Sequence, residues 1–455
     1  MTNNNNYRTI YELFKKVPQH NLEAWDDIYK SDFIKVLDAS ILQKNNTSHT
    51  SQIYTKNPEI KLPVLNSSDA PISLIYLILS KINDKGELCK FFSFCKDFTD
   101  YSTFVEWYKY HQRYLDINSL KNYIKTTSHN SIKTLGDLLF NPPSDRFRIH
   151  DMLYNNDFVS LDIQENYETN DLILEKYESD VLNFDIYIYR YPKDKTNYID
   201  IICSVLNIMK NLTMSYGIKG KHLKLTFFAS DKKKVLPLHG EPLTPSNINS
   251  GSTYPEKSIN IWRREEFMKV LIHELIHFYK LDFHKHPKLS NIIDNYIKLD
   301  TTIDSVDSCN ESYTETLALV INTYINSKLL GCDFRILLTN EIYFTALQVV
   351  KILKHHNYNN VYDIFRINLK QLTSVRSYYL VKFILLLNLQ EFLLLVHNTN
   401  LNINNKLDEY TNLINSSIVN RKYIFECSHI MSYLKNMPKS SLSNTMRMTL
   451  FDFFP

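Results

Sequence analysis

The sequence predicts an α+β fold that is mostly helical, with a small mixed sheet, an edge strand beside a central helix, and helical N- and C-terminal regions. Three observations predict this fold. Apolar residues recur at helical spacing over most of the chain. Alternating strand patterns are confined to the middle, as in residues 184–191. An apolar stretch at 270–279 contains two histidines one helical turn apart. We expect three regions: a helical one over 1–145, an α/β core over 146–335, and a helical one over 336–455 that closes a cleft.

The N-terminal third has few strand signals. Residues 7–40 have the spacing of amphipathic helix, and a polar loop follows over 41–72. Helical spacing returns over 72–139, where aromatic side chains are frequent and a helical core is expected. Pro142 and Pro143 then break the pattern.

The middle of the chain alternates between strands and helices. Strands are predicted at 184–191 and 222–229, with a helix at 199–214 between them. A loop is expected over 230–257, and a short strand at 258–262 leads into the central helix. This exposed strand would pair with an extended peptide by β-addition. Beyond residue 280, helices are predicted at 308–331, 340–356, 361–370, 374–398 and 404–415.

Composition excludes several classes of function. Only seven glycines occur, which argues against Gly-rich phosphate loops and dinucleotide fingerprints. Lys plus Arg number 52 against 49 Asp plus Glu, and this formal charge of +3 is too near neutral for a nucleic-acid footprint. The most apolar segment, 383–396, is interrupted by polar residues and too short to span a bilayer. We therefore expect no nucleic-acid and no membrane partner, and the sequence leaves the oligomeric state open.

The six cysteines and the N-terminus bear on location. No Cys-x-x-Cys pair occurs, so reduced thiols in a cytosolic compartment are expected. Residues 1–7 lack the charged-then-apolar pattern of a signal peptide. The expected location is cytoplasmic or virion-associated, without classical secretion.

The central helix carries His273-Glu274-Leu275-Ile276-His277. Spacing of four places both imidazoles on one helical face, where they can reach a single ion. Zn²⁺ suits imidazole ligands, and a catalytic zinc site takes three protein ligands and leaves one position open. Glu274 is then placed to act as the general base toward a zinc-activated water.

A third ligand is predicted from a second helix. Glu311 and Glu315 lie four residues apart beside an apolar run, so both carboxylates share one face at the cost of like-charge repulsion, which a cation would remove. Glu311 would complete the ligand set, and Glu315 would accept the free ring N–H of a ligating histidine. The alternatives are His284, seven residues after His277, and an acidic ligand from the next loop. Its candidates are Asp300, Asp304 and Asp307.

These two motifs resemble those of the gluzincin-type zinc metallopeptidases. The family pattern is His-Glu-x-x-His on one helix and an Asn-Glu pair opening a second helix, with an acidic residue four positions later. It matches here at His273–His277 and at Asn310-Glu311 with Glu315. The resemblance implies His273, His277 and Glu311 as zinc ligands, Glu274 as general base and a zincin-like core. The segment between the motifs is longer than in the best-known gluzincins. The chain is also similar to zinc metalloproteinases of large DNA viruses.

Peptide hydrolysis also needs a donor for the oxyanion. Tyr378 and Tyr379 are our candidates, because several helical gluzincins bring a similar tyrosine-rich segment over the metal; His355 and His356 are the alternative. The predicted function is zinc-dependent hydrolysis of peptide bonds in a protein or peptide substrate. Two other functions stay open. One is a non-catalytic scaffold, with a structural or vestigial metal site, and the other is a hydrolase acting on a non-peptide amide.

Overall fold

The structure, a computed structural model, describes residues 24–45, 54–62, 144–154, 156–284, 286–420, 428, 430–432 and 444–451. The helical segment predicted at 72–139 therefore lies outside the described residues. The chain forms two compact units. The first comprises Met1–Asn57, Lys176–Tyr187 and Lys195–Pro455, and the second comprises Pro58–Glu175 and Ile188–Asp194. The three regions predicted at 1–145, 146–335 and 336–455 stay a prediction.

The described strands form one mixed sheet and a separate two-stranded one. In the main sheet the order is β1-β3-β4-β5-β7-β6, and β2 pairs with β3. Strand β5 is parallel to β7, and β7 is antiparallel to β6. The bounds are β1 Thr55–Lys56, β2 Ile60–Leu62, β3 Leu172–Ser179, β4 Phe184–Arg190, β5 Leu223–Phe228, β6 Gly251–Tyr254 and β7 Ser258–Ile261. Strands β8 (Lys298–Leu299) and β9 (Asn368–Leu369) form the small parallel pair.

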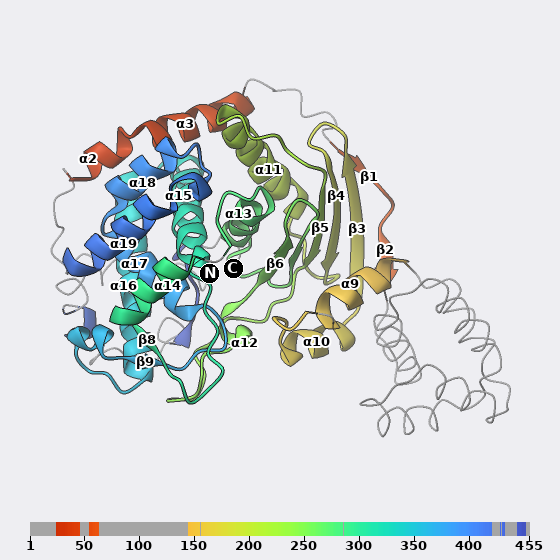
Figure 1. Ribbon diagram of the computed structural model, residues 1–455. Coiled ribbons are helices and arrows are strands. Elements are labelled where there is room, and N and C mark those ends of the chain that lie inside the picture. The colour runs from red at the N-terminus through yellow and green to blue at the C-terminus, as the bar shows by residue number, and fades with distance from the viewer. Residues whose placement is uncertain are drawn as a thin grey trace, which may run out of the picture. The chain divides into compact units, whose positions relative to one another are not determined.

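Helix α13 (Phe267–Phe278) is the centre of the first unit. It packs against β6 and β7 on one side and against α11 (Tyr198–Ser215) and α15 (Asn310–Leu330) on others (Figure 1). Every residue of α13 except His277 is buried, because apolar side chains surround most of its girth. Helix α15 is buried almost all round until it ends at Gly331, whose left-handed φ of 61° caps it. Two helices buried this deeply give the side chains between them little freedom.

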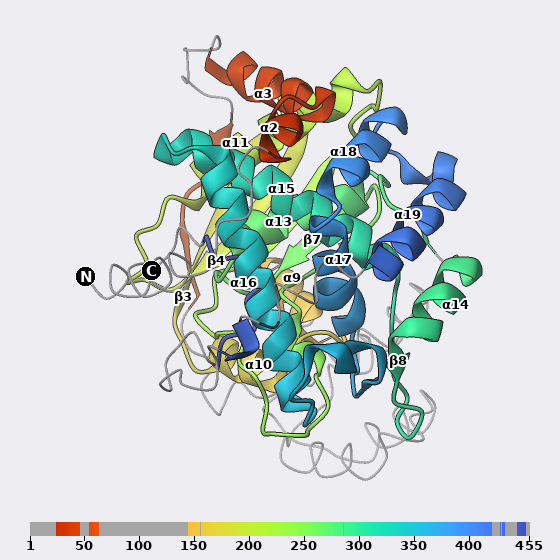
Figure 2. The ribbon, with the colours of Figure 1, turned by 90° about the vertical axis from the view of Figure 1, so that its left-hand side faces the viewer.

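Further helices cover α15 in the same unit. Helix α16 (Phe334–His355) packs along α15, and both contact α17 (Figure 2). The others in this unit are α2 Ala24–Tyr29, α3 Asp32–Asn45, α12 Pro245–Ile248, α14 Pro287–Tyr296, the 3-10 helix η2 Val361–Phe365, the π-helix η3 Arg376–Val381, α17 Lys382–Leu386, α18 Leu389–Asn398, the 3-10 helix η4 Ile403–Lys406 and α19 Leu407–Asn420. The second unit contains α9 Ser144–Tyr154 and α10 Leu161–Glu168. The predicted fold class, mostly helical with a small mixed sheet, is confirmed.

Several predicted elements need correction. The loop predicted at 230–257 contains β6, which turns back at Glu256 and pairs with β7. Consequently the strand predicted at 258–262 as the exposed edge is β7, an inner strand, and β6 is the edge beside α13. The helix predicted at 361–370 is a short 3-10 turn followed by β9. The helix predicted at 374–398 bends by 100° between α17 and α18, where Asn388 donates its amide to the carbonyl of Ile384.

Helix α16 is long and apolar enough to cross a membrane by length and composition, but 83% of the qualifying window is buried inside the protein. The bent pair formed by Arg376–Leu386 and Leu389–Asn398 also meets the criterion if it is counted as one span. Burial of this kind is what a core helix of the first unit requires.

Candidate metal centre

Helices α13 and α15 bring three predicted ligands together. His273 and His277 lie one turn apart on α13, and Glu311 lies in the first turn of α15. The Nε2 atoms of the two histidines are 3.1 Å apart. Glu311 Oε2 lies 3.2 Å from His273 Nε2 and 3.3 Å from His277 Nε2. Among the described residues, these three form the one group of ligand atoms close enough to hold a metal ion.

The other nitrogen of each histidine faces a carboxylate. His273 Nδ1 lies 2.9 Å from Glu315 Oε2, and His277 Nδ1 lies 2.9 Å from Asp282 Oδ2. Asp282 is held in turn by the side-chain amide of Asn310, at 2.7 Å. A carboxylate accepts hydrogen bonds, so each Nδ1 carries a proton. When either ring is neutral, its lone pair is therefore on Nε2, the nitrogen that faces Glu311.

This arrangement fits a zinc ion. Glu311 Oε2 has no hydrogen-bond partner among the described residues, although it is buried. Three lone pairs that face one another are repulsive unless a proton or a cation lies among them. Atoms bound at about 2.0–2.1 Å around a tetrahedral zinc are about 3.3–3.4 Å apart, close to the separations found here. Two neutral imidazoles and one carboxylate are also ligands that zinc accepts.

The titration behaviour of the group reflects these contacts. Burial opposes charging of His273, but the neighbouring carboxylates of Glu311 and Glu315 outweigh burial and raise its pKa. The pKa of His277 is raised further, because Glu311 and Asp282 overcome the same burial. The imidazoles of His277 and His273 hold the pKa of the buried Glu311 far below its usual value. The centre is thus built to hold positive charge beside an ionised Glu311.

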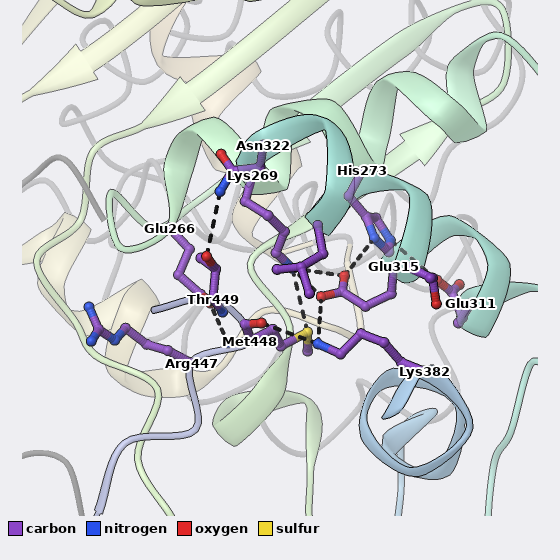
Figure 3. A network of polar contacts seen from close by, with 12 residues as sticks. Glu266, Lys269, His273, Glu311, Glu315, Asn322, Lys382, Arg447, Met448 and Thr449 are labelled. Atoms are coloured by element: carbon purple, nitrogen blue, oxygen red, sulfur yellow. Dashed lines mark hydrogen bonds and ion pairs between the residues drawn. The ribbon is translucent and has the colours of Figure 1, made fainter. Parts of the chain in front are cut away.

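Glu315 connects this centre to two buried lysines. Its carboxylate oxygens lie 2.7 and 2.8 Å from Lys269 Nζ, and Oε1 lies 3.3 Å from Lys382 Nζ (Figure 3). Lys269 lies on α13 one turn before His273, and Lys382 begins α17. Burial favours the neutral acid, but the charges of Lys269 and Lys382 hold the pKa of Glu315 well below its usual value. Glu315 is therefore an ionised acceptor that fixes the His273 ring.

The segment Asn444–Phe451, which we call the C-terminal strap, is held by buried side chains of the same unit. Glu266, just before α13, accepts hydrogen bonds from the backbone N–H groups of Met448 and Thr449 (Figure 3). Glu341 accepts from the backbone N–H of Leu450 and from the hydroxyl of Thr449. Lys382 Nζ donates to the carbonyl of Met448 at 3.2 Å. The strap therefore completes the polar surroundings of Glu315.

Glu274 lies against the edge strand. Its Oε2 accepts a hydrogen bond from Thr253 Oγ on β6, at 2.7 Å. Burial raises the pKa of Glu274, although the neighbouring histidines oppose this. A Cβ at Gly251 would lie 2.5 Å from Glu274 Oε1, so only glycine allows the strand to approach this carboxyl. A proton acceptor thus lies beside the candidate metal-binding group.

The two candidate tyrosines have different surroundings. Tyr378 is 9% exposed, and its ring centroid lies 6.0 Å from that of His273. Burial and the charges of Glu311 and Glu274 raise its pKa well above 10.0, so the phenol remains a proton donor. Tyr379 is fully buried, and its hydroxyl donates to the carbonyl of Met446 at 2.5 Å. Both lie on η3, and π-helical turns are frequent at functional sites.

The alternative ligands are placed elsewhere. His284 is exposed and is not in the metal-binding group. Asp300 bonds Thr302, and Asp307 bonds the buried guanidinium of Arg376. The alternative oxyanion donors His355 and His356 bond the backbone carbonyls of Glu241 and Ile352.

Sequence reasoning missed four contributors to the site. Thr253 and Gly251 lie in a segment predicted as loop, and Asp282 lies in the turn after α13. Lys269 had a usable signal, since a lysine inside an otherwise apolar buried helix, one turn before His273, needs an anionic partner.

Comparison of the chain with protein-family models, with curated proteins and with solved structures finds no match.

Proposed function

We propose that this protein is a zinc-dependent peptidase. The observation that carries the proposal is the convergence of His273 Nε2, His277 Nε2 and Glu311 Oε2 within 3.1–3.3 Å, with each histidine oriented by a carboxylate. A zinc ion held by these residues would supply a Lewis acid for the substrate carbonyl and would make water acidic enough to attack near neutral pH.

Glu274 is the proposed general base. Its buried carboxyl has a raised pKa, which suits a group that takes a proton and later gives it to the leaving amine. The Thr253 hydroxyl holds one carboxyl oxygen, which fixes the direction of the other. Positioning of this kind supports proton transfer, because the acceptor is already aimed before the substrate arrives.

Tyr378 is the proposed oxyanion donor. Among the described residues its hydroxyl has no hydrogen-bond partner, and its raised pKa keeps the proton on the phenol at neutral pH. A donor aimed at developing negative charge contributes more in a water-poor site than in bulk water.

Strand β6 is the proposed platform for the substrate backbone. It ends the strand order of the main sheet, so among the described residues its outer edge has no strand partner. An extended peptide can add to such an edge by main-chain hydrogen bonds. A protein or peptide is therefore the substrate class that we propose.

The test combines metal analysis with peptide cleavage. The protein is stripped with a chelator and reloaded with zinc, and elemental analysis should show about one zinc per chain. The reloaded protein should cleave members of a mixed peptide library, identified by mass spectrometry. Glu274→Gln should keep the zinc and lose about 100-fold or more of the rate.

Two outcomes count against the proposal. Cleavage that survives in Glu274→Gln would remove this residue from the mechanism. One tightly held zinc without cleavage of any peptide would favour the scaffold with a structural metal.

A further inference from the structure

A small hollow lies beside the metal-binding group. It is open to solvent, and His273 and Glu274 are among the residues that line it. Its wall includes the residues just before and at the start of β6, Ser250 and Gly251. Because β6 is the proposed platform for the substrate, a side chain next to the scissile bond would enter this hollow.

The wall of the hollow holds hydrogen-bond donors without matching acceptors. Lys234 is 2% exposed, and the one acceptor that the described residues give its Nζ is Glu266 Oε2, at 2.7 Å. An ammonium has three N–H donors, so two remain. Ser250 is 4% exposed, and its Oγ has no hydrogen-bond partner in the described part of the chain.

Charges of both signs line the hollow. The side chains of Lys234 and Lys269 are buried there together with the carboxylates of Glu274 and Glu315. Glu315 bonds Lys269, and Glu266 bonds Lys234 and also accepts two backbone N–H groups of the C-terminal strap. A further carboxylate would therefore be held by the spare N–H donors of Lys234 and not by a net positive charge.

Part of the wall is apolar. Ile248, Val270 and Met448 line it, and they can contact the methylene groups of an entering side chain.

We propose that this hollow is a specificity pocket that binds a carboxylate next to the scissile bond, through Lys234 and Ser250. The proposal rests on the proposed peptidase function. The carboxylate has two possible sources with the same chemistry, the side chain of an Asp or Glu residue and the α-carboxylate at a peptide C-terminus.

The test measures selectivity with peptides that differ in one group. Zinc-loaded protein is given two pairs of peptides. The first pair is amidated at the C-terminus and has Asp or Asn directly after the cleaved bond. The second pair has no acidic side chain and ends at the residue after the cleaved bond, either as a free acid or as an amide. If the side chain is the source, kcat/KM for Asp should exceed that for Asn by about tenfold or more. If the C-terminus is the source, the free acid should exceed its amide by a similar factor. Equal rates for each carboxylate and its amide would overturn the proposal.

Variants assign the selectivity to the pocket. Lys234→Met should bring the favoured carboxylate/amide ratio close to one, and Ser250→Ala should lower it by about threefold to tenfold. Lys233→Met is the matched control, because the neighbouring side chain is exposed, and its ratio should equal that of the unmodified protein. The ratio within one variant does not depend on the folded fraction, and Ser250→Ala serves if Lys234→Met folds poorly. A ratio unchanged in both pocket variants would refute the assignment.

Binding separates this proposal from the proposed function. Zinc-loaded Glu274→Gln protein is titrated calorimetrically with the same four peptides. One outcome is that a carboxylate peptide binds more tightly than its amide, that Lys234→Met abolishes this preference, and that the unmodified protein cleaves neither peptide. This outcome would support the pocket and refute the peptidase. Cleavage without any preference for the carboxylate would support the peptidase and refute the pocket.

Discussion

Gly251 lies so close to Glu274 that a Cβ on the glycine would be 2.5 Å from Glu274 Oε1 and 2.9 Å from Glu274 Cδ. Real Cβ atoms do not come this near, so a larger residue would push either β6 or the carboxyl away. The edge strand and the proposed base are thus positioned against each other.

We expect Gly251→Ala to lower kcat by about 100-fold while zinc content stays near that of the unmodified protein, because displacing a catalytic group by about 1 Å has effects of this size. Gly220→Ala is the control, since its Cβ would meet nothing nearer than 3.9 Å. Kinetics and elemental analysis of both variants are the measurement. Full activity in Gly251→Ala would mean that Glu274 needs no fixed position.

Removing a proposed ligand should abolish tight zinc binding. Glu311→Gln or His277→Ala leaves two ligands, and we expect the zinc affinity to fall on the order of 1000-fold. Loss of a residue that only orients a ligand typically lowers the affinity by about tenfold to 100-fold. Competition with a fluorescent chelator measures the affinity. His284→Ala, which changes an exposed imidazole outside the group, should bind zinc like the unmodified protein. Equal loss in His284→Ala would identify His284 as the third ligand instead.

The tyrosine pair offers matched substitutions. Tyr378→Phe should lower kcat by about 100-fold with little change in KM, because the hydroxyl acts on charge that develops only in the transition state. Tyr379→Phe should leave kcat nearly unchanged, but lower the free energy of unfolding by about 1–3 kcal/mol, because the carbonyl of Met446 loses its donor. Steady-state kinetics and urea unfolding distinguish the two. The reverse pattern would make Tyr379 the donor.

Glu341 gives a pH dependence of stability that is separate from the metal centre. Burial raises its pKa from 4.5 to about 7, although Thr449, Leu450 and Phe451 donate hydrogen bonds to it. Between these two pH values the unfolded chain releases the proton and the folded chain keeps it, so stability falls as pH rises from 4.5 to about 7. The contribution is about 3 kcal/mol.

Glu341→Gln should therefore flatten this part of the stability profile. The measurement is the urea midpoint at several pH values across the window, compared with the unmodified protein. Glu391→Gln, on an exposed position of α18, is the control and should keep the original slope. An unchanged slope in Glu341→Gln would show that another group titrates there.

Local patterns predicted those parts of the site that lie within single helices. Four-residue spacing alone places His273 and His277 on one face of α13, and Glu311 and Glu315 on one face of α15. The two helices do meet, and Glu315 does bond His273 Nδ1. Zinc binding and catalysis by this group stay predictions.

The remainder of the site depends on tertiary contacts. Strand β6 is four residues long and has no alternation of buried and exposed positions, so only its pairing with β7 defines it. Tyr378 lies beside His273 whereas Tyr379 bonds the carbonyl of Met446, and neighbouring tyrosines have no sequence signal that separates them. Asp282 became a partner of His277 through a turn whose shape the sequence did not indicate.

The C-terminal strap also determines when the protein can finish folding. The residues of α13 and α15 are synthesised long before Asn444–Phe451. During this interval Glu266 and Glu341 lack the backbone N–H groups that bond them in the folded protein. Contacts between residues this distant in sequence form late. The surroundings of Glu315 are therefore completed only after translation has passed the strap, and a nascent chain carries the motif without its finished environment.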